Sequence, residues 1–106
     1  MRYRVHYAKP EAKRELLMGF NWPQSQVILR CPREETHVFL KEVEAEGPWE
    51  VFQSMQGEVW SPNGEARALI EEKGLWHTSM SVGDLLEDEQ GRFFFCDSFG
   101  WRELSA

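Results

Sequence analysis

The chain has 106 residues, of which 42% are hydrophobic, and carries 12 basic and 18 acidic side chains. This length suits one domain with a core that needs neither disulfides nor a metal. The formal net charge of −6 removes the general attraction for phosphate backbones that drives nucleic-acid binding, and no stretch approaches the roughly 18 apolar residues of a membrane span. Nucleic acid and membrane are therefore not expected as partners.

The two cysteines, Cys31 and Cys96, and the three scattered histidines form none of the usual ligand pairs for a metal. We therefore expect neither a metal site nor a cofactor. Basic residues Arg2 and Arg4 interrupt the start where a signal peptide would lie, so the sequence favours a reduced, cytoplasmic protein. Cys96 lies in an apolar run and is expected to be a small core residue.

The first half of the chain predicts a strand, a helix and a second strand. Residues 2–8 alternate between apolar and polar side chains, which is typical of a half-buried strand. A helix is predicted over residues 10–18, with Pro10 in its first turn and Gly19 after its end. Residues 27–29 lie between two prolines and predict a loop or a brief edge strand. Residues 36–43 are β-branched and apolar enough for the second strand.

Two further helices are predicted in the middle of the chain. Gly47-Pro48 begins the first, which places Trp49, Phe52 and Met55 on one face before Gly57 ends it. The second follows Ser61-Pro62, with the serine as N-cap and the proline at the first helical position. Its apolar residues recur at helical spacing, and Gly74 supplies a left-handed C-cap.

The last third predicts β structure. Residues 85–87 and 92–97 form a hairpin closed by residues 88–91, and residues 101–104 form a terminal strand after a bend at Gly100. Strands at both ends of the chain around central helices predict a single small α+β domain. We expect one mainly antiparallel sheet with two to three short helices.

Two motifs in this last third carry a resemblance. The stretch from His77 to Asp84 reads HTSMSVGD, and Cys96 to Trp101 reads CDSFGW. Over about residues 76–104 they resemble the YodL-like domain family, whose members have similar elements separated by a hairpin. Gly83 departs from the family, in which better-known members tend to have serine, and this favours a backbone role there. The resemblance implies a bacterial protein of plasmids, integrative elements or phages, and it assigns no catalytic residue.

A hydrolase hypothesis can be written with Ser79 or Ser81 as nucleophile, His77 as base, and Asp84 or Asp97 as the orienting acid. The spacing argues against it, because no nucleophile elbow and no glycine-rich oxyanion loop accompany the serines. The alternative is that the hydroxyls bond to backbone groups while Asp84 caps a turn. We therefore assign no catalytic residue.

Other polar and aromatic residues are candidates for recognition. Asp97 and Ser98 either hold the corner before Gly100 or contact a ligand. At least one of the tryptophans is expected on a surface that faces a partner, because tryptophan is over-represented at interfaces. The candidate binding residues are Glu58, Trp60, Asn63, Glu65, His77, Ser79, Ser81, Asp84, Asp97 and Ser98.

The sequence thus favours a non-enzymatic protein-interaction module with a protein partner. By the resemblance, such a module would serve a mobile element or phage and inhibit or modulate a host protein. The alternatives are a protein that binds a small ligand or nucleotide, and an uncharacterised enzyme. The sequence does not settle the oligomeric state.

Overall fold

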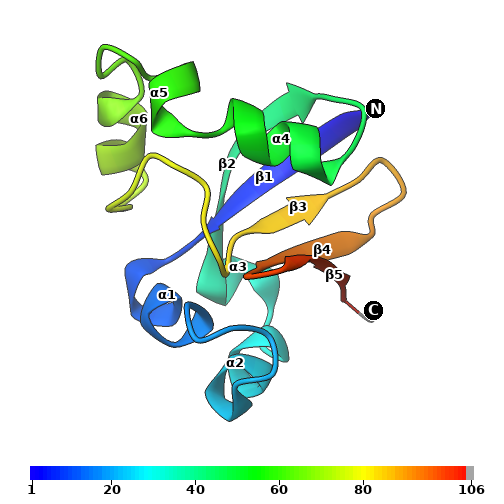
Figure 1. Ribbon diagram of the computed structural model, residues 1–106. Coiled ribbons are helices and arrows are strands. Elements are labelled where there is room, and N and C mark those ends of the chain that lie inside the picture. The colour runs from blue at the N-terminus through cyan, green and yellow to red at the C-terminus, as the bar shows by residue number, and fades with distance from the viewer. Residues whose placement is uncertain (105–106) are drawn as a thin grey trace.

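A computed structural model describes residues 1–104 and contains one antiparallel sheet of five strands. The order of the strands across the sheet is β2-β1-β3-β4-β5, so the N-terminal strand lies inside the sheet (Figure 1). The strands are β1 (Arg2–Ala8), β2 (His37–Glu44), β3 (Leu85–Glu87), β4 (Phe93–Asp97) and β5 (Gly100–Glu103). The predicted single α+β domain with an antiparallel sheet is confirmed.

The described residues form six short helices rather than two or three. They are α1 (Pro10–Leu16), α2 (Pro23–Leu29), α3 (Arg33–Thr36), α4 (Pro48–Ser54), α5 (Gly57–Trp60) and α6 (Arg67–Glu72). None exceeds seven residues. Isolated helices of this length are unstable in water, so these must owe their stability to packing. Within residues 1–104, no helix has the length and hydrophobicity that a membrane span requires.

The alternation of side chains along the strands builds a core on each face of the sheet. Leu85 and Leu86 are both fully buried, and because they are adjacent in β3 they point to opposite faces. Leu86 joins the core under α4 and α6, and Leu85 joins the core under α1 and α2. Figure 1 shows these two groups of helices at different ends of the sheet. The sheet therefore holds together two separate helical layers.

A β-bulge in β2 adjusts the pairing of the two longest strands. Val5 pairs with Lys41, whereas His6 pairs with Phe39, so Leu40 is an extra residue. Leu40 is buried in the core beneath α4 and α6. The β-branched and apolar residues of this segment predict the strand but give no sign of the bulge.

The prediction for residues 27–29 was wrong, because they belong to α2. Pro23 occupies the first turn of this helix, where a missing N–H costs nothing, and so it starts a helix instead of bounding a loop. The hydroxyl of Ser25 is buried and donates to the Glu15 carbonyl of α1 at 3.3 Å. This contact between helices stabilises a segment whose own pattern is ambiguous.

The middle of the chain also differs from its prediction in detail. Gly57, the predicted end of one helix, begins α5 instead. The helix predicted to follow Ser61 begins only at Arg67, and the Ser61 hydroxyl accepts the Ala66 N–H at 2.9 Å across the intervening turn. Val51 of α4 and Met55, which directly follows this helix, are fully buried, whereas Trp49 is 58% exposed. The predicted face is therefore correct for Met55 and for Phe52, which packs against the core, but wrong for Trp49, and it omits Val51.

The hairpin of β3 and β4 is confirmed and has an internal support. The Asp88 carboxylate accepts the N–H groups of Gln90 and Arg92, both at 2.9 Å. It also pairs with the Arg92 guanidinium at 2.7 Å. Hydrogen bonds from backbone and side chain thus fix the turn that closes the hairpin.

The backbone at Gly83 packs directly against Leu16 of α1. Its φ is +101°, and a Cβ at this position would lie 2.8 Å from the Leu16 Cβ. Only glycine fits without movement of the helix. The backbone role expected of Gly83 from the sequence therefore has a steric cause.

We expect Gly83→Ala to lower the free energy of unfolding by about 2–4 kcal/mol, because left-handed strain adds to overpacking against Leu16. Gly74→Ala is the matched control, since Gly74 has a φ of +72° and open space around a Cβ. The control should lose only about 1–2 kcal/mol. Urea denaturation measures both values, and equal losses would contradict the close approach.

Candidate functional site

A buried ion pair joins α1 to the loop before β3. The Lys13 ammonium lies 2.9 Å from Asp84 Oδ1, and the Asp84 side chain is completely buried. The carboxylate also accepts the Ala8 N–H on Oδ1 and the Ser81 N–H on Oδ2, each at 2.9 Å. Lys13 donates in addition to the Ser81 carbonyl at 3.3 Å. Asp84 therefore does cap the turn of residues 81–84, and it also ties that turn to β1 and α1.

Burial and pairing shift the pKa values of Asp84 and Lys13 in opposite directions. Burial raises the pKa of Asp84, while the charge of Lys13 and the two backbone donors oppose the rise. Burial likewise lowers the pKa of Lys13, against the attraction of Asp84. Each charge therefore depends on the other, because either one alone would be a desolvated ion in the protein interior.

His77 lies beside this pair with its ring held in place. The ring stacks on Tyr7 with centroids 4.7 Å apart and an interplanar angle of 19°. Its Nδ1 lies 2.8 Å from the Ser79 carbonyl, so Nδ1 carries the proton. In the neutral ring Nε2 is then an acceptor; it is buried, lies 4.0 Å from Asp84 Oδ1 and has no hydrogen-bond partner among the described residues.

A second histidine fixes the backbone next to Asp84. His37 Nε2 donates to the Gly83 carbonyl at 2.9 Å, and its Nδ1 lies 2.8 Å from the Thr36 hydroxyl. Burial lowers the pKa of His37 to about 4, although the bond to Gly83 opposes the shift. This ring is therefore neutral at physiological pH and serves as a fixed donor.

The Ser79 hydroxyl bonds to backbone rather than to a histidine. The Ser79 hydroxyl accepts the Gly57 N–H at 2.7 Å. Neither ring nitrogen of His77 meets a serine hydroxyl, since Nδ1 contacts the Ser79 carbonyl and Nε2 has no partner. The geometry thus brings His77, Ser79, Ser81 and Asp84 into one loop without forming a serine–histidine pair. Burial raises the pKa of the neighbouring Cys96 thiol to about 12, which agrees with the core position predicted for it.

The candidates near α5 lie on the other side of the same loop. Trp60 is half-buried and donates from Nε1 to the Thr78 carbonyl at 3.1 Å, while Glu58 is exposed. Asn63 and Glu65 are both exposed and bond to each other, with the Glu65 carboxylate 2.8 Å from the Asn63 N–H. An open groove of about 690 Å³ lies nearby; its lining is Gly57, Ser61, Gly64, Arg67, Ile70, Glu71, Leu75, Trp76 and Thr78.

Asp97 and Ser98 are placed elsewhere, at the corner between β4 and β5. Asp97 Oδ1 accepts the Ser98 N–H at 2.8 Å, and Gly100 has a φ of +122°. Both residues line a cleft of about 290 Å³, the α1–Phe99 cleft. It is formed by Met18, Gly19, Phe20, Asn21, Asp97, Ser98, Phe99, Gly100, Trp101 and Arg102. The candidates from the sequence therefore divide between two regions.

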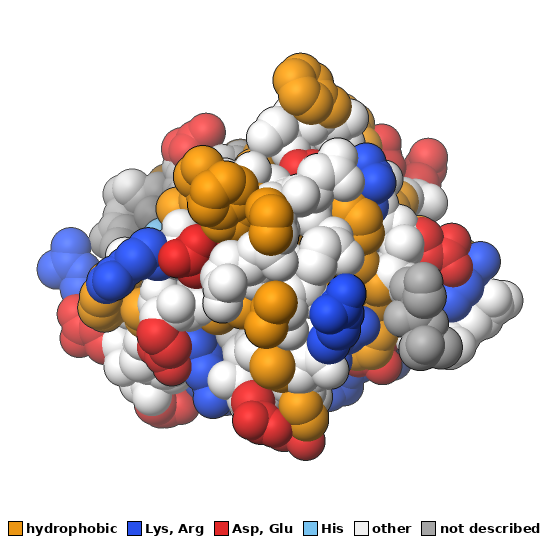
Figure 2. Space-filling view, turned by 90° about the horizontal axis from the view of Figure 1, so that it is seen from below, with side chains coloured by type: hydrophobic (Ala, Val, Ile, Leu, Met, Phe, Trp, Pro, Cys, Tyr) orange, Lys and Arg blue, Asp and Glu red, His pale blue; other side chains and the backbone are white. Residues whose placement is uncertain are grey.

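Exposed hydrophobic side chains gather around the end of α1. Leu17 is 52% exposed, Met18 60%, Trp76 80% and Phe99 fully exposed. Leu17 and Trp76 line one cleft, Met18 and Phe99 line another, and Leu17 and Met18 are neighbours in the chain. We call these four residues the apolar band. Figure 2 looks at the end of the molecule formed by α1 and α2 and shows hydrophobic side chains exposed among charged ones.

The sequence reasoning missed α1 as part of the site. It named neither Lys13, the partner of Asp84, nor Leu17, which is exposed in the apolar band. Lys13 did carry a signal, because it shares a helical face with Ala12 and Leu16, both of which are buried. A lysine that is buried on such a face needs a counter-charge, which Asp84 provides.

Lys13→Met is expected to lower the free energy of unfolding by about 3–5 kcal/mol, since it leaves Asp84 buried without a counter-charge. The double variant Lys13→Met/Asp84→Asn should lose less than the sum of the two single variants, because it removes both charges. A double-mutant cycle from chemical denaturation measures the difference. Additive losses would show that the two charges do not depend on each other.

The low pKa of His37 predicts a loss of stability in acid. The unfolded chain takes up this proton near pH 6.5 and the native state only near pH 4, so the free energy of unfolding falls as the pH drops through that window. The expected contribution is about 2–3 kcal/mol. His37→Gln should show a smaller decrease than wild type between these pH values in urea denaturation. Parallel curves for the two proteins would contradict the assignment.

Comparison with known proteins identifies no relative of this chain. No protein-family model, curated protein or solved structure matches the chain.

Proposed function

We propose that this protein is a non-enzymatic protein-interaction module whose partner docks on the apolar band. The observation that carries the proposal is the clustering of exposed hydrophobic side chains. Of the nine large hydrophobic residues that are exposed within residues 1–104, six lie in residues 17–27 or line a cleft together with residues of that segment. They are Leu17, Met18, Trp22, Val27, Trp76 and Phe99. Hydrophobic surface that gathers in one region is typical of a binding site, whereas scattered residues are not.

The aromatic residues of the band suit it for recognition. Trp76 and Phe99 are among the most exposed hydrophobic residues of the chain. Tryptophan is enriched among the few interface residues that contribute most of the binding energy. In the free protein both rings remain in contact with water, so a partner that covers them gains the hydrophobic free energy of their burial.

The band rests on a rigid base. Trp76 precedes His77, whose ring is fixed by Tyr7 and by the Ser79 carbonyl. Leu17 follows the helix that Lys13 anchors to Asp84. Binding surfaces that are ordered before they meet a partner lose less conformational entropy on binding. This rigidity supports a recognition role for the band.

The resemblance of residues 76–104 to YodL-like domains supports a more specific proposal. We propose a bacterial source on a mobile element or phage, and a host protein that the module inhibits or modulates. A cytoplasmic location is part of the same proposal. The free thiols of Cys31 and Cys96 support it, because reduced cysteines are typical of that compartment.

A small ligand is the second candidate, and the groove beside α6 favours it. This groove holds about 690 Å³ and is lined by Arg67 and Trp76 among others. Trp76 also lines the cleft beside α1, so it separates the two hollows. Arg67→Glu would weaken the binding of a ligand in the groove, whereas changes at Met18 and Phe99 would weaken the binding of a protein on the apolar band.

Met18→Ser/Phe99→Ser is expected to abolish partner capture while leaving the fold intact, because both side chains are largely exposed. The tagged protein would be expressed in a bacterial host and co-purifying proteins quantified, with binding of any captured partner then measured on purified components. Trp49→Ser/Val59→Ser is the matched control, since each residue is 58% exposed and lies outside the band. Equal loss in both variants, or loss in neither, would contradict the proposed surface.

A further inference from the structure

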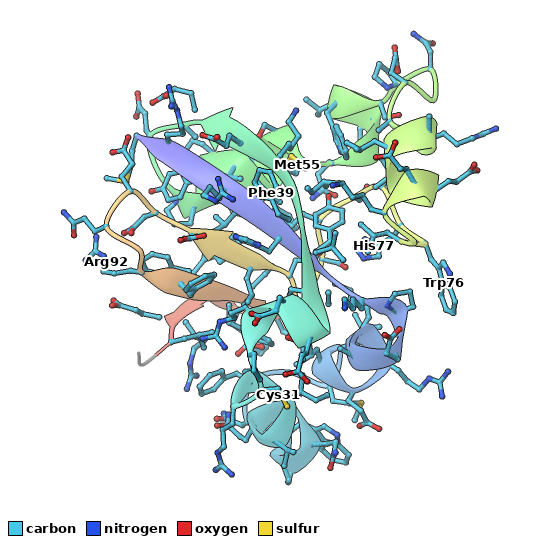
Figure 3. All side chains as sticks on the ribbon, turned by 180° about the vertical axis from the view of Figure 1, so that it is seen from behind. Cys31, Phe39, Met55, Trp76, His77 and Arg92 are labelled. Atoms are coloured by element: carbon cyan, nitrogen blue, oxygen red, sulfur yellow. The ribbon has the colours of Figure 1, made fainter. Side chains whose placement is uncertain are left out.

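A small cleft lies between α1 and the loop that carries Trp76. We call it the α1–Trp76 cleft; it holds about 150 Å³ and is lined by Pro10, Lys13, Arg14, Leu17, Trp76 and His77. A cavity of this volume accommodates a group about the size of benzene. In Figure 3, Trp76 projects away from the body of the protein, whereas His77 lies nearer the sheet. The cleft thus has the size of one side chain and an exposed indole beside it.

The ionisable groups that line this cleft are all basic. Lys13 and Arg14 come from α1 and His77 comes from the opposite loop. The Lys13 charge is balanced by Asp84, which is completely buried and does not line the cleft. Arg14 differs, because its side chain is exposed and no carboxylate in residues 1–104 lies within ion-pair distance of it. The one uncompensated charge at the cleft is therefore a guanidinium.

We infer that the α1–Trp76 cleft receives an acidic and apolar anchor from the partner protein. An aromatic or aliphatic side chain of the partner fills the space between Leu17 and Trp76. A neighbouring Asp or Glu of the partner pairs with Arg14, whose planar guanidinium suits bidentate binding of a carboxylate. This inference rests on the proposed function and adds the chemistry of the partner segment.

The distribution of charge along the chain supports an acidic partner at this end. Residues 1–35 carry seven basic and four acidic side chains, whereas residues 36–106 carry five basic and fourteen acidic ones. The α1 to α3 region therefore lies in the less acidic part of the protein. The acidic side chains of residues 36–106 would repel an acidic segment of the partner and so direct it toward α1 as the two proteins meet. Electrostatic attraction thus orients the partner, and burial of its apolar side chain beside Trp76 supplies most of the affinity.

The α1–Phe99 cleft does not offer the same chemistry. It contains Arg102, but it also contains the carboxylate of Asp97. The Arg102 guanidinium lies over the Phe20 ring, 4.4 Å from its centroid. An acidic group placed there would meet a like charge, so the acidic anchor belongs at Arg14 rather than in this second cleft.

Selection from a random peptide library displayed on phage tests the inference directly. The folded wild-type protein is expected to enrich peptides with Asp or Glu next to an aromatic or aliphatic residue. For a synthetic peptide with the enriched sequence, Arg14→Glu should weaken binding by about tenfold or more in a fluorescence titration. Arg67→Glu is the matched control, because Arg67 is also exposed but lies at the other groove. Binding to Arg14→Glu should recover when the acidic residue of the peptide is replaced by lysine.

Three results would overturn the inference. Enriched peptides without an acidic residue, or an affinity that Arg14→Glu does not change, would remove the carboxylate anchor. The proposed function would survive that result if Met18→Ser/Phe99→Ser still abolished partner capture. If no peptide is enriched and that variant captures partners as wild type does, both the inference and the interaction surface are overturned.

Discussion

The carboxylate of Asp84 is the constraint on which the rest of this structure depends. It receives hydrogen bonds from Ala8 at the end of β1 and from Ser81 in its own turn, and it pairs with Lys13 of α1. Two regions that are distant in the sequence, residues 8–13 and residues 81–84, thus meet on two oxygen atoms. A fully buried charge tolerates few geometries, because each lost donor leaves an unsatisfied ion. The position of α1 on the sheet follows from this requirement.

The neighbouring contacts extend the same junction without adding net charge. His37 holds the Gly83 carbonyl, and the absence of a side chain at Gly83 lets Leu16 pack against the backbone. On the other side, the Tyr7 hydroxyl donates to the Thr78 carbonyl at 2.7 Å while its ring supports His77. A polar network of this kind specifies one arrangement of its parts. The residues exposed above it, including Trp76, are therefore presented in a fixed geometry.

The sequence predicts the strands and the first helix because their patterns are local. Alternation identifies β1, the turn residues 88–91 mark the hairpin, and Pro10 marks the start of α1. It fails where packing or a side chain from elsewhere decides, as in α2, in the bulge at Leu40 and in the late start of α6. The same limit applies to the site. The motif from His77 to Asp84 made both residues candidates. The counter-charge of Asp84, however, is Lys13, which lies about seventy residues away on a helix that the sequence predicted only from its terminal residues.

The placement of β1 inside the sheet has a consequence for how this chain folds as it is made. One edge of β1 pairs with β2, but the other pairs with β3, and the bond between Ala8 and Asp84 spans 76 positions. Until about residue 87 has left the ribosome, β1 has an open edge, and Lys13 has no counter-charge. The domain therefore cannot complete either core during most of its synthesis. Structure that forms mainly through such distant contacts is acquired late and slowly, and any chain that stops before Asp84 exposes an unpaired strand beside an unfinished core.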